Sequence, residues 1–133
     1  MFRKVLCVAL SGMLASPIAL AASQQRIETI TAQVHAGMAL AANTLPTARS
    51  HFHHVINCLV DPDSKLFDKR AENPCAGMGA EKGALHDEAQ TDAQKKDLQH
   101  ALGVAQRGLS SKTLEVAHVY AEWLSEILKD ANT

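Results

Sequence analysis

The sequence predicts an all-α protein, a four-helix bundle made of two helical hairpins that are joined by a long loop. Two observations favour this fold. In four segments after the N-terminal region, apolar residues recur every three or four positions, which is the repeat of an amphipathic helix. Between the second and third of these segments, residues 61–91 contain the Pro and Gly residues that interrupt helices. Each segment has one apolar face, and packing four such faces together buries all of them.

The composition is that of a single globular domain. The chain has 133 residues, of which 47% are hydrophobic, and a formal net charge of −1. A disordered chain would be less apolar and more strongly charged. A nucleic-acid-binding protein would show an excess of basic residues and aromatic stacking platforms, but only 4% of these residues are aromatic. We therefore expect no nucleic-acid partner.

Residues 1–21 have the pattern of a cleaved signal peptide. Arg3 and Lys4 precede an apolar run at 5–20, and Ala19-Leu20-Ala21 matches the small-x-small pattern of a cleavage site. The run is short for a membrane span. The alternatives are an uncleaved anchor and a buried N-terminal helix. We expect a periplasmic or secreted protein with no stable membrane insertion after cleavage, and one mature domain at 22–133.

The first predicted hairpin joins helices at 23–43 and 45–59. Thr44 can cap the second helix, and Pro46 suits its first turn, where a missing N–H group costs little. The expected apolar face of the first helix consists of Ile27, Ile30, Val34, Met38 and Ala41. The expected apolar face of the second consists of Leu45, Ala48, Phe52, Val55, Ile56 and Leu59.

Cys58 and Cys75 are the two cysteines that remain after signal cleavage. An even pair in an oxidising compartment favours a disulfide. The bond would close a loop of about 17 residues, stabilise the fold by about 3 kcal/mol and fasten the loop at 61–91 to the second helix. The alternative is a pair of thiolate metal ligands. Leu66 and Phe67 are expected to pack against the bundle, because exposing both would be costly.

The second predicted hairpin joins helices at 92–109 and 112–130, with a break at Ser110-Ser111. Gly103 would weaken the first of these helices or allow a neighbouring helix to approach it. Trp123 lies away from the centre of its apolar face, where it would cover an edge or contact a partner. The remaining apolar positions of the hairpin are Leu98, Ala101, Leu102, Ala105, Leu109, Leu114, Ala117, Ala121, Leu124 and Leu128.

Three histidines form the main candidate site. His51 and His54 are three residues apart, so they share one side of their helix. The preceding helix turns back near residue 44 and brings His35 to the same level. Imidazoles in this pattern suit copper, zinc or nickel ions, with His86, Asp61 or water completing the ligand set. The alternative is that these are half-buried histidines that bind no metal.

Apart from these histidines, the sequence offers one further candidate metal site and lacks several common cofactor and catalytic motifs. Met78, Glu81, His86 and Asp87 form a second candidate metal site in the loop. The sequence contains no CxxCH, GxSxG or glycine-rich phosphate loop, and Glu-x-x-His motifs do not occur on two helices. We therefore expect no haem, no nucleotide cofactor and no enzymatic activity. His100 and His118 are interpreted as non-functional.

The signal pattern, the four short helices and the histidines on them together resemble the small bacterial periplasmic helical-bundle metal-binding proteins. The residues that carry the resemblance are His35, His51, His53, His54 and His118. It covers the architecture of the mature chain, and it implies a role in buffering, sensing or delivering a metal ion. The cysteine pair and the long loop depart from that pattern. The competing hypothesis is a metal-free periplasmic interaction module that presents the loop and Trp123 to an unknown protein, and a third is an acid sensor.

Overall fold

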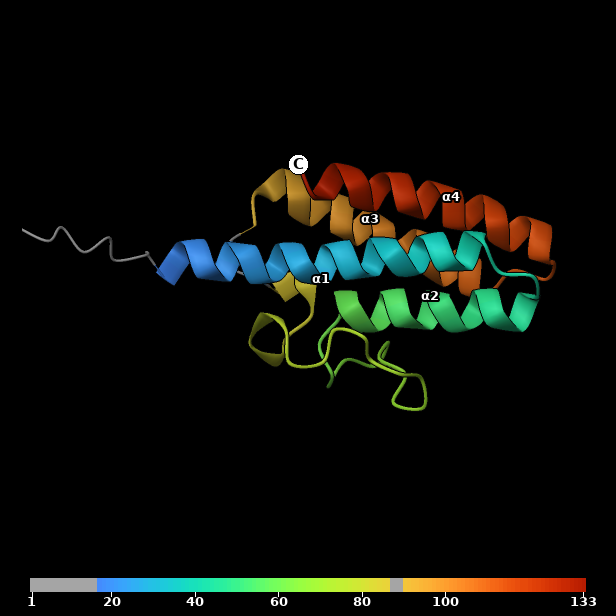
Figure 1. Cartoon of the computed structure of the whole chain (residues 1–133), viewed down its shortest axis with the longest axis horizontal. Helices are drawn as coiled ribbons and strands as arrows, with labels where there is room; N and C mark the ends of the chain where they lie inside the picture. The colour runs from blue at the N-terminus through green and yellow to red at the C-terminus, as the bar shows by residue number, and fades with distance from the viewer. Residues whose placement is uncertain (1–16, 87–89) are drawn as a thin grey trace, which may run out of the picture.

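The computed structural model describes the backbone of residues 17–86 and 90–133 and the side chains of residues 27–86 and 90–133. Within these residues the protein is all-helical and contains no strand, as the sequence predicts. The helices α1 (Pro17–Leu40), α2 (Leu45–Leu59), α3 (Asp92–Leu109) and α4 (Leu114–Ala131) lie side by side in one bundle (Figure 1). Two short 3₁₀ turns, η1 (Gly79–Glu81) and η2 (Ala84–His86), lie in the segment between α2 and α3.

The contacts between pairs of helices in the bundle differ in size. α1 packs mainly against α2 and α4, and α3 packs mainly against α4 and α2. The contact between α2 and α4 is smaller, as expected for helices that lie across the bundle from each other. α1 therefore has two helical neighbours, and its side toward α2 holds part of the candidate site.

Three threonines define where helices begin. The Thr44 side chain accepts a hydrogen bond from the backbone N–H of Thr47 at the start of α2, and Thr113 plays the same part at α4. Thr91 and Gln94 cap α3 reciprocally, side chain to backbone in both directions. These caps satisfy backbone donors that the first turn of a helix leaves unpaired. α2 and α3 accordingly have the predicted bounds, and α4 begins two residues after the predicted position.

α1 is longer at its start than the sequence suggests. It begins at Pro17 rather than residue 23, and it ends at Leu40 rather than residue 43. The predicted cleavage position after Ala21 therefore lies within the α1 backbone. Residues 1–16 of the predicted signal peptide lie outside the described residues.

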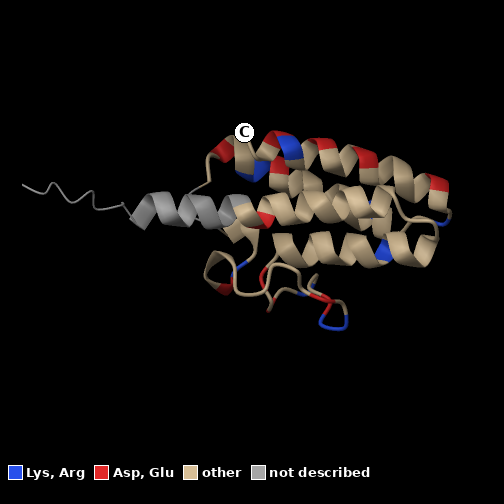
Figure 2. Ribbon diagram, in the orientation of Figure 1, with Lys and Arg blue, Asp and Glu red and all other residues tan. Residues whose placement is uncertain are grey.

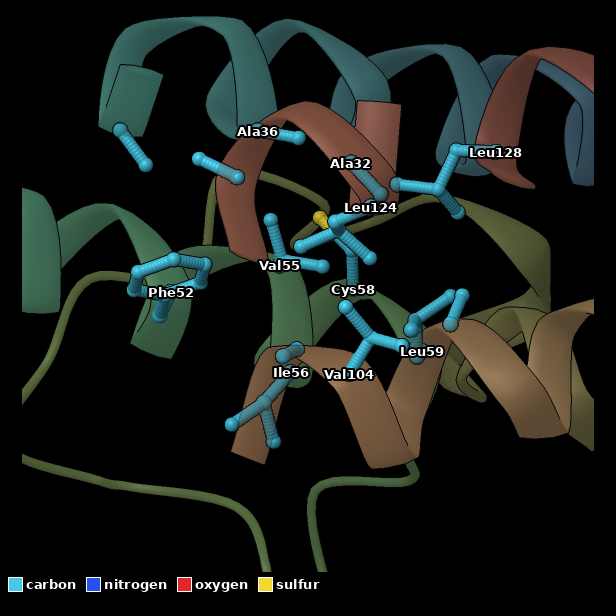
Figure 3. Packing of buried hydrophobic residues seen from close by; sticks show 14 of the residues in the cluster. Ala32, Ala36, Phe52, Val55, Ile56, Cys58, Leu59, Val104, Leu124 and Leu128 are labelled. Atoms are coloured by element: carbon cyan, nitrogen blue, oxygen red, sulfur yellow. The ribbon is translucent and has the colours of Figure 1, made fainter. Parts of the chain in front are cut away.

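The large side chains of the core come from α2, α3 and α4. Phe52, Leu59, Leu98, Leu124 and Leu128 are all at most 1% exposed. Figure 3 shows four of them, Phe52, Leu59, Leu124 and Leu128, within the core cluster. These residues belong to the apolar faces that the sequence predicts. Leu45, Leu102, Leu109 and Leu114 are partly buried at the edge of the same cluster. The periodicity of these three helices therefore identifies their core faces correctly.

The predicted core face of α1 is wrong. Ile27, Ile30, Val34 and Met38 are 44–50% exposed, and Ala41 is exposed as well. The residues that α1 buries in the core are small: Ala32, Ala36 and Ala39. Apolar residues lie on nearly every side of this helix, so their spacing does not select one face. Alanines leave room for the backbones of α2 and α4 to come close, and that close approach decides which side is buried.

Gly108 allows α3 to lie close to α2. A Cβ atom at this position would lie 2.3 Å from the Phe52 ring, far inside contact distance. Gly103, the glycine that the sequence analysis considered for a close approach, would have nothing within 4 Å of its Cβ. The large Phe52 ring is therefore accommodated by the absence of a side chain at Gly108.

The loop between α2 and α3 is attached to the bundle at two adjacent residues of α2. The Cys58 and Cys75 sulfur atoms are 1.95 Å apart, in a disulfide whose residues are both buried. Asn57 is 2% exposed; its side-chain oxygen accepts from the Asp68 N–H, and its amide group donates to the carbonyl oxygens of Asp68 and Glu72. The last turn of α2 therefore holds the first half of the loop.

Two loop predictions have different outcomes. Phe67 packs against the core, but Leu66 is 43% exposed, so the expectation that both would be covered is wrong for Leu66. Gly79 has a φ of +53°, and a Cβ atom there would lie 2.5 Å from the buried Glu28 carboxylate. This glycine lets the loop backbone pass over α1 at Glu28.

Charged side chains are distributed unevenly (Figure 2). Within the described side chains, α1 carries only Glu28 and α2 only Arg49, whereas α3 and α4 each carry both acidic and basic residues. In the described part of the chain, no helix has both the length and the apolar content needed to cross a membrane.

Candidate metal centre

The structure brings the three histidines selected from the sequence into one cluster. His35 extends from α1, and His51 and His54 extend from α2. One potential ligand atom from each ring lies within 4.8 Å of the others. Nδ1 of His35 is 3.2 Å from Nδ1 of His51 and 3.2 Å from Nδ1 of His54. We call these three residues the histidine cluster.

The packing of α1 against α2 explains this convergence. His51 and His54 are one helical turn apart, so both rings lie on the side of α2 that faces α1. The tight connection at residues 41–44 returns the chain, which places His35 beside them. The ring centroids are 4.7–5.5 Å apart. Two rigid helices therefore set the positions of the three rings.

Burial keeps the cluster neutral. The pKa of His35 is lowered from 6.5 to about 4, chiefly because burial removes water from the ring and secondarily because charges on His54 and His51 would repel its own. Burial also lowers the pKa of His51 and of His54. Neutral imidazole has a free lone pair, which is the form that binds metal ions.

Two of the three distances between ring nitrogens lie near the value expected around a tetrahedral ion. Metal–nitrogen bonds of about 2.0–2.1 Å place the ligand atoms of a tetrahedron about 3.3–3.4 Å apart. Two of the distances in the histidine cluster are 3.2 Å. A square-planar centre would require adjacent nitrogens about 2.8–2.9 Å apart. These two distances lie closer to the tetrahedral value, and the ligand atoms of His51 and His54 lie within 4.8 Å of each other.

Hydrogen bonds among the rings account for only part of this geometry. A neutral imidazole nitrogen either carries one proton or offers one lone pair. The Nδ1 atom of His35 can therefore form one good N–H···N bond, with His51 or with His54, but not both. Yet both distances are 3.2 Å. An ion bound by three lone pairs would satisfy both close approaches at once.

The other helix-borne histidines lie elsewhere. Nδ1 of His53 is 3.5 Å from the Asp68 carboxylate, so this ring faces the loop. Hydrogen bonds from Arg70 lower the pKa of Asp68 to about 2 and keep it negative beside His53. Nε2 of His118 lies 2.9 Å from the Ala42 carbonyl oxygen. His100 is exposed on α3.

The fourth ligands suggested by the sequence do not join the cluster. His86 and Asp61 form an ion pair with each other, and Asp61 also accepts a hydrogen bond from the Gly83 N–H. In the second candidate site, Met78 packs against the core and Asp87 lies outside the described residues. Among the described His, Cys, Asp and Glu residues, the histidine cluster is the one group of three with ligand atoms this close.

One nearby acidic residue was missed by the sequence analysis. The negative charge of Glu72 raises the pKa of both His35 and His54, opposing part of the effect of burial. The signal that could have indicated it is the position of Glu72 three residues before Cys75. A disulfide to Cys58 brings that part of the loop back to α2, one turn beyond His54.

The comparisons with protein-family models, curated proteins and solved structures find no match to this chain.

Proposed function

We propose that this protein is an exported bundle of two helical hairpins, joined by a disulfide-fastened loop, that binds one transition-metal ion at His35, His51 and His54. The role would be to buffer, sense or deliver that ion rather than to catalyse a reaction. The ion would lie between α1 and α2. The rings would bind it through Nδ1 and carry their protons on Nε2.

The observation that carries the proposal is the pair of 3.2 Å contacts from Nδ1 of His35. Three uncharged rings from two helices, with ligand atoms within 4.8 Å of one another, form a chelating site of borderline softness, suited to zinc, copper or nickel. The hydrogen-bonding capacity of the rings leaves one of these contacts unexplained. Metal binding explains both.

Calorimetric titration of the mature, untagged and chelator-treated protein tests the proposal. We expect one ion per chain, bound with micromolar or tighter affinity. Removing a residue that only orients a ligand weakens metal binding about 10–100-fold, so His51→Ala/His54→Ala should weaken it by more than about 100-fold. Circular dichroism would establish that this variant is folded. Unchanged affinity would reject the site, and no binding by the wild type would reject the function.

His53→Ala provides the matched control. It removes an imidazole from the same helix, but that ring faces Asp68 rather than the cluster. Its metal affinity should stay within about twofold of the wild-type value, because it removes no ligand. An equal loss in His53→Ala and His51→Ala/His54→Ala would indicate nonspecific binding to surface histidines.

A metal-free interaction module is the second candidate function, and exposed apolar side chains favour it. Trp123 is 55% exposed and borders an apolar cavity of about 310 Å³ on α3 and α4. Ile27, Ile30, Val34 and Met38 form a second exposed row on α1. Soluble monomers rarely expose large contiguous apolar patches. This candidate predicts that the wild-type chain binds no metal in the titration. It also predicts that the Trp123→Ala variant loses binding to the partner protein.

A further inference from the structure

Glu72 is held beside the histidine cluster by two attachments. Its carbonyl oxygen accepts a hydrogen bond of 3.3 Å from the Asn57 side chain, which lies one helical turn beyond His54. Three residues later, Cys75 is bonded to Cys58. The backbone at Glu72 therefore cannot move far from α2, although its side chain is exposed.

The hydrogen bond from Asn57 places the Glu72 backbone at the last turn of α2, about one helical turn beyond His54. The Glu72 carboxylate carries a charge that affects His35 and His54, which belong to different helices. It stands outside the group whose ligand atoms all lie within 4.8 Å of one another, so it would have to rotate to reach a bound ion. Such a rotation is a local rearrangement of one exposed side chain, and it leaves the backbone in place.

The other carboxylate on this part of the loop is already engaged. Asp68 accepts hydrogen bonds from the Arg70 backbone and guanidinium groups and pairs with His53. The carboxylate of Glu72 forms no hydrogen bond or ion pair with any residue that the structure describes; only its backbone carbonyl oxygen accepts a hydrogen bond. It is therefore the carboxylate that can turn toward an ion without losing a partner.

We propose that Glu72 supplies the fourth ligand of the histidine cluster and that the completed centre holds a tetrahedral divalent ion of the Zn²⁺ type. This inference rests on the proposed metal binding. Three imidazole nitrogens and one carboxylate oxygen form a ligand set that Zn²⁺ accepts in tetrahedral geometry. Ni²⁺ favours square-planar or tetragonal arrangements, and Cu⁺ favours softer sulfur ligands. The two 3.2 Å distances are longer than the spacing of adjacent nitrogens in a square plane, and the carboxylate is a harder ligand than Cu⁺ favours.

Four protein ligands would leave no open coordination position. Catalytic zinc sites keep one position for water or substrate, whereas sites that only hold the ion are closed. A closed centre suits storage or transfer of the ion. Binding would also attach the loop to both α1 and α2, so the metal would add to the fastening that Asn57 and the disulfide provide.

The test compares Zn²⁺, Ni²⁺ and Co²⁺ binding to the wild type and to Glu72→Gln, which keeps the shape of the side chain and removes its charge. We expect the wild type to bind Zn²⁺ about tenfold or more tightly than Ni²⁺. Glu72→Gln should weaken Zn²⁺ binding at least as much as the loss of a residue that only orients a ligand, about 10–100-fold, and the Co²⁺ spectrum distinguishes a ligand from such a residue. The visible absorption of bound Co²⁺, which reports coordination geometry, should be intense in the wild type and altered in the variant.

Glu81→Gln is the charge-matched control. Glu81 is an exposed acid on the same loop, outside the histidine cluster, so its removal should leave affinity and the Co²⁺ spectrum unchanged. If Glu81→Gln lost as much Zn²⁺ affinity as Glu72→Gln, the effect of Glu72 would be explained by its negative charge acting at long range. Its role as a ligand would then be overturned.

The outcomes separate the two proposals. If the wild type binds no ion, the proposed function fails, and the ligand assignment fails with it. If the wild type binds and Glu72→Gln retains both the affinity and the spectrum, the histidine site stands and the assignment of Glu72 is overturned. If Ni²⁺ binds as tightly as Zn²⁺, the tetrahedral selectivity is overturned.

Discussion

α1 and α2 each carry part of the histidine cluster, yet they bury different kinds of side chain. α2 places Phe52, Val55 and Leu59 in the core with no measurable exposure. α1 places alanines there and leaves Val34 and Met38 about half exposed. The comparison shows that side-chain size does not decide which face of a helix is buried when apolar residues surround it.

The difference follows from what each helix packs against. α2 lies near Gly108 of α3, and this glycine leaves space for the Phe52 ring. α1 lies between α2 and α4, and its alanines permit close approach to both. Close approach of α1 and α2 is also what places His35 within 3.2 Å of the α2 rings. Larger side chains on this face of α1 would separate the ligands.

The largest expected effect contrasts Phe52→Ala with Val34→Ala. Phe52→Ala removes a fully buried ring and should lower the free energy of unfolding by about 3–5 kcal/mol. Val34→Ala truncates a side chain that is 50% exposed, so it should change the free energy of unfolding by less than about 0.5 kcal/mol. Urea denaturation of the metal-free protein measures both. A cost above about 1.5 kcal/mol for Val34→Ala would show that α1 is covered in solution.

A smaller effect is expected from enlarging the buried alanines of α1. Ala36 is fully buried, so Ala36→Leu should destabilise the fold by about 1–3 kcal/mol through overpacking. It should also weaken metal binding, because α1 must move away from α2. Val34→Leu introduces the same residue on the exposed side and should be nearly neutral. If both variants were equally tolerated, the close approach of α1 would not be needed for folding.

The smallest expected effect concerns the pH dependence of the metal-free protein. The pKa of His35 is about 4 in the folded state, below its ordinary 6.5. Between these values the unfolded chain binds a proton that the folded chain does not, so stability should fall as pH is lowered from 6.5 toward 4. Because the ring is partly exposed, water screens its charge, and we expect a loss of about 1–2 kcal/mol.

Two variants sharpen that measurement. His35→Gln should reduce the pH dependence of urea unfolding between pH 6.5 and 4, and the lowered pKa values of His51 and His54 account for what remains. His100→Gln removes an exposed histidine of α3 and should leave the pH dependence of urea unfolding unchanged. A profile that responds to His100→Gln but not to His35→Gln would contradict the assignment of the effect to the cluster.

Much of the fold follows from local patterns. Threonine caps, Pro46 in the first turn of α2 and the apolar repeat are local features, and they predict the bounds of α2 and α3. The spacing of His51 and His54 is also local, because three residues make nearly one turn. The sequence also predicts that His35 approaches these residues, and the packing of α1 against α2 places it there.

The buried face of α1 and the position of Glu72 required tertiary structure. An apolar repeat indicates only that some side of a helix must be covered, and apolar residues lie on nearly every side of α1. Its contacts with α2 and α4 select the side with the alanines. Glu72 is far from the histidines along the chain, and only the loop closed by Cys75 and Asn57 brings it near them. Sequence patterns describe neighbours along one helix, whereas ligands and core faces depend on distances between elements.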